Sequence, residues 1–179
     1  LPDFEEDLQA VIDRCKAVGI DKIYLPAIDS STHDAMMALA AAQPGLCIPM
    51  IGLHPCYVTA DYHQEMQLVE SWLEKQPFAA IGEIGLDFYH STDFKQEQID
   101  VFLRQMDLAL QYELPIVIHS RSSMDECIKL IADHGKGSIK GIFHCFGGDE
   151  RQARRIIDLG FMQFDGTKLV RSYSSLVRC

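Results

Sequence analysis

Three residues with metal-binding or acid–base side chains each lie within or directly after an apolar run. Glu83 interrupts the run 79–87, and His119 and His144 follow the runs that begin at Leu114 and Lys140. An ionised carboxylate among apolar residues is costly to bury unless it has a partner. A carboxylate with two neutral imidazoles suits zinc, manganese and other divalent cations. These residue types therefore predict a metal site, provided that the fold brings them together.

The elements that carry these three residues are predicted to be parallel strands. The run 79–87 has apolar residues on both faces of an alternating strand, which is typical of a strand covered on both sides. Glu83, His119 and His144 are separated by 36 and 25 residues, about the length of one strand–helix unit. Polar side chains at the C-terminal ends of successive parallel strands meet at one mouth, where a (β/α)8 barrel places its chemistry.

Strands and helices alternate along the chain. Apolar periodicity indicates five strands and six helices before residue 161, with capping boxes that begin at Asp3 and Ser123. This alternation predicts an α/β fold with a parallel sheet. A complete TIM barrel has eight strand–helix units and about 250 residues. We therefore expect an incomplete TIM-type (β/α)8 barrel over residues 1–162, without the first strand and the last strand–helix unit, followed by an atypical tail over 163–179.

Four motifs together resemble the TatD family of metal-dependent deoxyribonucleases, over roughly residues 1–162. They are Gly52-Leu-His54-Pro55, Gly82-Glu-Ile-Gly-Leu-Asp87, His119-Ser-Arg121 and His144-Cys-Phe-Gly147. The resemblance implies hydrolysis of phosphodiester bonds in DNA, acting from an end or on a single strand. It assigns Glu83, His119 and His144 to a site of two adjacent divalent cations (Mg, Mn or Zn), with Glu83 bridging them and serving catalysis.

Three further residues have two open interpretations each. The resemblance places His54 near the substrate phosphate, although a histidine that caps the Pro55 loop is equally expected. Arg121 either holds a phosphate in a bidentate grip or pairs with an acid such as Asp87. Asp87 either orients a ligand histidine or forms a structural ion pair.

The sequence departs from the family in two places. It has neither the His-x-His pair expected on the first strand nor the aspartate of a Thr-Asp sequence on the last. Two other functions therefore stay open: a metal-dependent hydrolase of a small amide or ester, and a truncated, inactive chain. The tail, which contains three serines and three basic residues after position 167, suggests a truncated or shifted reading frame.

Composition restricts the partners and the compartment. The formal net charge of −10 disfavours a broad basic surface for duplex DNA. Six cysteines without a Cys-x-x-Cys pair predict reduced thiols in a cytoplasmic protein, and no apolar run is long enough to span a membrane. The glycine pattern near Gly147 does not fit nucleotide binding. We expect Cys145 to pack inside, and His33, His63, His90 and His134 to be solvated.

Overall fold

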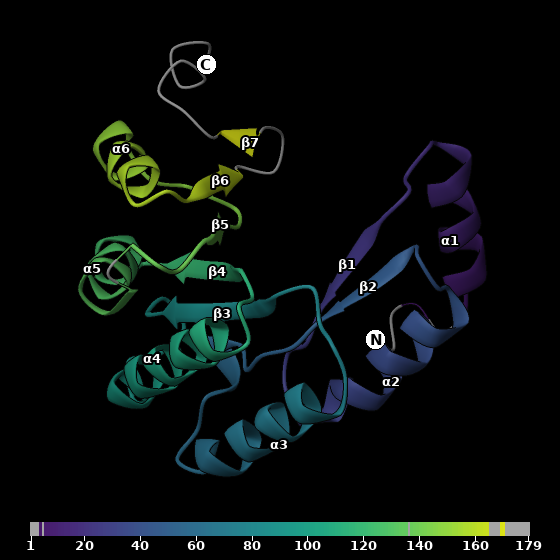
Figure 1. The fold of residues 1–179 in the computed structure, drawn as a ribbon, viewed down its shortest axis with the longest axis horizontal. Helices are drawn as coiled ribbons and strands as arrows, with labels where there is room; N and C mark the ends of the chain where they lie inside the picture. Colours follow the sequence, from purple (N-terminus) through teal and green to yellow (C-terminus); the bar gives the residue numbers. More distant parts are fainter. Residues whose placement is uncertain (1–3, 5, 136, 165–168, 171–179) are drawn as a thin grey trace.

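The structure, a computed structural model, describes residues 4, 6–135, 137–164 and 169–170. Strands lie at its centre and helices lie outside them (Figure 1). The helices are α1 (Leu8–Ala17), α2 (Ser30–Ala42), α3 (Tyr62–Lys75), α4 (Lys95–Gln111), α5 (Met124–Gly135) and α6 (Glu150–Asp158), with a short 3-10 helix η2 (Pro55–Tyr57). The strands are β1 (Ile23–Pro26), β2 (Cys47–Met50), β3 (Ile81–Asp87), β4 (Ile116–Arg121), β5 (Gly141–Phe143), β6 (Met162–Phe164) and β7 (Leu169–Val170).

The strands pair in parallel in chain order, as the alternation of elements predicts. β1 pairs with β2, and β3, β4, β5 and β6 form a continuous parallel series that ends in the antiparallel β7. A parallel bridge between Ile51 and Ile81 joins the two groups. The predicted α/β fold with parallel strands is therefore confirmed. In the described part of the chain, hydrogen bonds do not close these strands into a complete ring.

The helices cover the outer face of this array. Figure 1 shows α4, α5 and α6 along one side of β3 to β6, and α1 and α2 beside β1 and β2. The isoleucines of β3 and β4 are fully buried, as are Phe102 and Met106 of α4. Each such side chain contributes about 1.5–3 kcal/mol when it leaves water. This burial fixes β3 and β4 at the positions of Glu83 and His119.

Several local expectations need correction. α1 begins at Leu8 rather than at residue 3, and the proposed capping box there involves Asp3, outside the described residues. The Ser123 hydroxyl donates to the carbonyl of Leu86 (2.7 Å), which ties α5 to β3, and neither hydrogen bond of the predicted box with Glu126 is found among the described residues. The reciprocal box is found instead at Asp149 and Gln152, where it starts α6.

Two predictions about single residues are wrong. His33 is buried (3% exposed) with its ring 6.2 Å from Trp72, because α2 packs on α3 at this point. Cys145 is exposed, because β5 ends at Phe143 and the chain then turns through a positive φ of 47° at Cys145. Strand alternation therefore does not extend to this cysteine.

The tail lies largely outside the described residues. Among the described helices, none combines the length and apolar character needed to cross a lipid bilayer.

Candidate metal centre

Strand β3 supplies two carboxylates to the mouth of the parallel array. Glu83 is half-buried near its middle, and Asp87 is its last residue, with a side chain only 2% exposed. β3 and β4 run in register from Gly85 beside His119 to Asp87 beside Arg121. Gly85 is required here because a Cβ would lie 2.1 Å from the His119 carbonyl oxygen. The close approach of these two strands brings both carboxylates to the same imidazole.

His119 lies between the two carboxylates. Its Nε2 is 2.8 Å from Asp87 Oδ2, and its Nδ1 is 3.5 Å from Glu83 Oε1. Burial alone would lower the pKa of His119, but the hydrogen bonds and charges of Glu83 and Asp87 outweigh burial and raise it. Both ring nitrogens thus face anionic oxygen, which favours the imidazolium form when no cation is bound. A divalent cation can replace one of these protons between the same donor atoms.

The pKa values of the two carboxylates shift in the opposite direction, downward. Burial acts to raise the pKa of Glu83, but the hydrogen bond from His119 and the charges of His144 and His54 lower it overall. Burial likewise acts to raise the pKa of Asp87, and is outweighed by His119 and by the backbone N–H groups of Tyr89 and His90. Both side chains are therefore anionic at neutral pH, as ligands of a hard cation must be.

His54 reaches the same place from the end of β2. Its Nδ1 accepts a hydrogen bond from the backbone N–H of Cys56 (3.2 Å), which caps η2. Its ring centroid is 4.5 Å from that of His119. Burial, followed by the charge of His119, lowers the pKa of His54. The capping interpretation is thus observed, and it leaves Nε2 with the proton, because Nδ1 acts as the acceptor.

His144 lies at the edge of this group. Its backbone N–H bonds the Ile118 carbonyl (2.9 Å), which continues the pairing of β4 and β5 by one residue. Its Nε2 is 3.2 Å from Cys145 Sγ, and its ring stacks on Phe164 with centroids 6.3 Å apart. Its charge helps to lower the pKa of Glu83. Among the described residues, however, His144 belongs to no group of three potential ligands whose donor atoms lie within 4.8 Å of one another. Its role as a ligand stays a prediction.

Arg121 is exposed beside the carboxylates without pairing with Asp87 among the described residues. Its guanidinium carbon lies 3.8 Å from the ring centroid of Tyr89, and its Nη1 is 3.1 Å from His90 Nε2. Stacking on an aromatic ring holds the guanidinium plane while its N–H donors stay available. This arrangement suits an arginine that binds an anion from solvent.

Two glutamines of α4 fix the backbone on either side of the centre. Gln98 accepts from the N–H of Asp87 (2.9 Å) and donates to its carbonyl (3.2 Å). Gln105 does the same for Leu53, the residue before His54 (2.7 and 3.2 Å). Both glutamines are buried. They satisfy backbone groups that leave the sheet, and so hold Asp87 and His54 in place.

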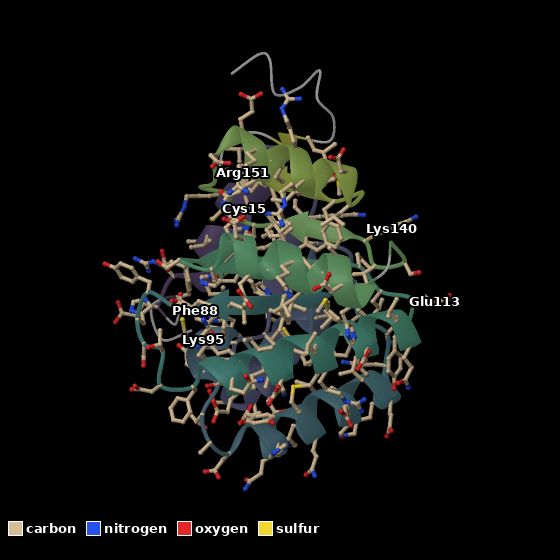
Figure 2. The ribbon with its side chains drawn as sticks, turned by 90° about the vertical axis from the view of Figure 1, so that its left-hand side faces the viewer. Cys15, Phe88, Lys95, Glu113, Lys140 and Arg151 are labelled. Atoms are coloured by element: carbon tan, nitrogen blue, oxygen red, sulfur yellow. The ribbon has the colours of Figure 1, made fainter. Side chains whose placement is uncertain are left out.

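A groove of about 790 Å³ leads away from the centre. It is lined by His119, His144 and Arg121, by the start of α5 and by the Gly147-Gly148 loop. Figure 2 shows Phe88 and Lys95 on this side of the molecule and Glu113 and Lys140 at the opposite ends of the strands. The Lys95 ammonium lies 4.6 Å from the Phe88 ring centroid. The mouth therefore offers both cationic side chains and aromatic surface to a substrate.

Sequence reasoning missed Cys56 as a member of this region, and it named Tyr89 and His90 as residues that could line the mouth without assigning them a role. The signals were weak: Cys56 follows His54 by two residues, and Tyr89 and His90 follow Asp87 directly. Cys56 Sγ lies 3.4 Å from Asp87 Oδ2. Burial, followed by the hydrogen bond to Asp87, raises the pKa of the Cys56 thiol to about 11.

The fold and the site are those of a partial α/β barrel with a candidate metal centre at its mouth. The family model for TatD related DNase matches residues 1–168, so the chain belongs to this family. The crystal structure of YjjV, a TatD homolog from Escherichia coli, superposes with a TM-score of 0.82 at 28% identity, covering 91% of this chain and 63% of that one. A TatD family hydrolase from Entamoeba histolytica superposes with a TM-score of 0.73 at 27% identity, over 89% and 56% of the two chains.

Curated relatives match over most of the chain. The uncharacterized metal-dependent hydrolase YabD of Bacillus subtilis is 29% identical over 91% of this chain and 64% of its own length. Human deoxyribonuclease TATDN3 is 29% identical over 96% and 66%. The 3'-5' ssDNA/RNA exonuclease TatD of Yersinia pseudotuberculosis is 28% identical over 88% and 60%. The chain thus spans less than two thirds of the length of these relatives.

Proposed function

We propose that this protein hydrolyses phosphodiester bonds of DNA, at an end or in a single strand, with divalent cations bound at the mouth. The observation that carries the proposal is the half-buried Glu83 carboxylate, whose close polar contact among the described residues is the His119 ring. Such a carboxylate is poorly satisfied by one imidazole, and a cation completes its surroundings. The family membership and the names of the relatives support the reaction class.

The donor set fits the proposed cations. We propose that Glu83, His119 and His144 would hold these cations, while Asp87 orients His119. Carboxylate with imidazole suits manganese or zinc, and magnesium accepts the carboxylate oxygens. The 179 residues contain no His-x-His pair, and their Thr-Asp sequence, Thr92-Asp93, precedes α4 rather than ending a last strand, so the donors named here are those that this sequence supplies.

The chain's own residues would position the substrate. When bound, divalent cations would lower the pKa of a water molecule and neutralise charge on the scissile phosphate. Arg121, held flat against Tyr89, binds the non-bridging phosphate oxygens. His54 donates through its Nε2–H, because its Nδ1 is engaged with Cys56.

The five described cysteines are all free, which fits a reducing compartment such as the cytoplasm.

The test is hydrolysis of an end-labelled single-stranded oligonucleotide with magnesium or manganese, comparing the wild-type chain with Glu83→Gln. Glu74→Gln, an exposed carboxamide substitution on α3, is the matched control. We expect cation-dependent cleavage that falls at least about 100-fold in Glu83→Gln and is unchanged in Glu74→Gln. Cleavage that survives Glu83→Gln would refute the assignment, and no cleavage with any cation would leave the inactive chain as the correct interpretation. Faster hydrolysis of small esters than of DNA would favour the small-substrate alternative.

A further inference from the structure

Two hydrogen-bond donors meet at a single oxygen beside the proposed centre. The Cys56 thiol and the His119 Nε2 both contact Asp87 Oδ2, at 3.4 and 2.8 Å. That oxygen belongs to a side chain that is 2% exposed. A buried carboxylate oxygen that accepts two hydrogen bonds can also accept a cation. In that case the cation takes the place of the two protons and is bound by the oxygen, the sulfur and the ring nitrogen.

The surrounding donors are those of a thiolate metal site. His54, Cys56 and His119 each offer one ligand atom, and these atoms all lie within 4.8 Å of one another. Cysteine and histidine with a nearby carboxylate are the donors that zinc and cobalt prefer, whereas magnesium selects oxygen alone. Glu83 does not belong to this group, and Cys56 does not belong to the Glu83 donor set.

The backbone favours this arrangement before any metal binds. Pro55 begins η2, and the bond from the Cys56 backbone N–H to His54 Nδ1 holds these two residues together; a cation would take the place of this N–H at the Nδ1 lone pair. Gln98 fixes Asp87 in the same way from α4. The four donors therefore come from the ends of three strands, and contacts of their own hold the residues after β2 and at the end of β3.

We propose that Cys56, His54 and His119, with Asp87 beside them, form a site selective for zinc and similar thiophilic cations, distinct from the Glu83 centre. Binding would form bonds from the metal to the Cys56 thiolate and the His119 imidazole, and the thiol proton and the His119 Nε2 proton would both pass to solvent. Because His119 serves both groups, zinc at Cys56 withdraws this imidazole from Glu83. One consequence rests on the proposed function: zinc inhibits the hydrolysis that magnesium or manganese supports.

Cys145 provides a matched comparison. It is also exposed and lies 3.2 Å from a histidine nitrogen, that of His144. Among the described residues, no third donor joins this pair within 4.8 Å. A thiol next to a single imidazole binds a cation weakly, so Cys145→Ser tests whether an exposed thiol near histidine suffices.

The experiment is a cobalt titration of the whole 179-residue chain under reducing conditions, followed through the thiolate-to-cobalt charge-transfer band in the near ultraviolet. We expect the band in the wild-type chain, in Cys145→Ser and in Glu83→Gln, and its loss in Cys56→Ser. Zinc should displace the cobalt, and its affinity should fall at least about tenfold in Cys56→Ser. No band in the wild-type chain, or an undiminished band in Cys56→Ser, would overturn the proposal.

A second arm measures zinc inhibition against each variant's own uninhibited rate. Inhibition should require higher zinc in Cys56→Ser than in Cys145→Ser, and equal inhibition of both would overturn the link between the two groups. The cobalt titration needs no DNA, so it decides on the thiolate site even if the chain hydrolyses nothing. Hydrolysis without a cobalt band would conversely leave the proposed function intact and remove this inference.

Discussion

Replacing Gln98 with leucine should release the end of β3 without changing the size of the buried side chain much. The side-chain amide of Gln98 holds both the N–H and the carbonyl of Asp87, at 2.9 and 3.2 Å. Leucine leaves both backbone groups buried without partners, at a cost of about 1–3 kcal/mol each. The apolar gain of leucine offsets part of this cost, so we expect a net loss of about 2–4 kcal/mol.

The assay is urea unfolding followed by circular dichroism, with Gln96→Leu as the control. Gln96 lies on the same helix and is exposed, bonded only to Asp100 one turn on among the described residues. We expect Gln96→Leu to stay within about 0.5 kcal/mol of the wild type. A loss of about 2–4 kcal/mol is a large part of the 5–15 kcal/mol that stabilises a typical domain. Equal unfolding midpoints and slopes for the two variants would refute the positioning role of Gln98.

Three further predictions concern the residues around His119. Gly85→Ala should cost about 2–6 kcal/mol in a urea titration, because the new methyl meets the His119 carbonyl at 2.1 Å and φ is 131°; unchanged stability would contradict the close strand contact. In peptide mapping by mass spectrometry, alkylation of Cys56 should keep accelerating up to about pH 11, since burial and then Asp87 raise its pKa; a plateau near 9 would contradict this. Despite burial, Glu83 and Asp87 raise the pKa of His119, so its contribution to stability is present below pH 6.5 and lost as pH rises through the folded-state pKa. His119→Gln should flatten this fall in urea titrations at successive pH values, and an unchanged slope would contradict the carboxylate contacts.

The order and type of the elements could be predicted from the sequence because they depend on local patterns. The apolar stripe of residues 95–112 corresponds to α4, which covers 95–111, and the run around Glu83 corresponds to β3. Within the described residues before 161, the expected count of five strands and six α-helices is confirmed. Parallel pairing then follows, since helices connect successive strands and leave their carboxyl ends on one side. For the same reason Glu83 and His119 could be placed together.

The surroundings of each side chain could not be predicted in the same way. His33 is buried because Trp72, on the next helix, covers it, and nothing within α2 indicates that contact. The exposure of Cys145 depends on the end of β5, and strand ends are set by hydrogen bonding to neighbours rather than by alternation. Arg121 stacks on Tyr89 rather than pairing with Asp87 among the described residues, and no spacing in the sequence encodes that contact; its phosphate-binding role stays a prediction.

The mouth of the array owes its geometry to a helix as much as to the strands. Where β2 and β3 end, the backbone of Leu53 and Asp87 turns out of the sheet while still buried, and its polar groups need partners. Gln105 and Gln98, seven residues apart on the inner face of α4, supply them. A polar residue at buried helical spacing is the sequence signal for such a role, because burial without a partner would be too costly. The carboxylate and imidazole of the centre are thus held from behind by amides that do no chemistry themselves.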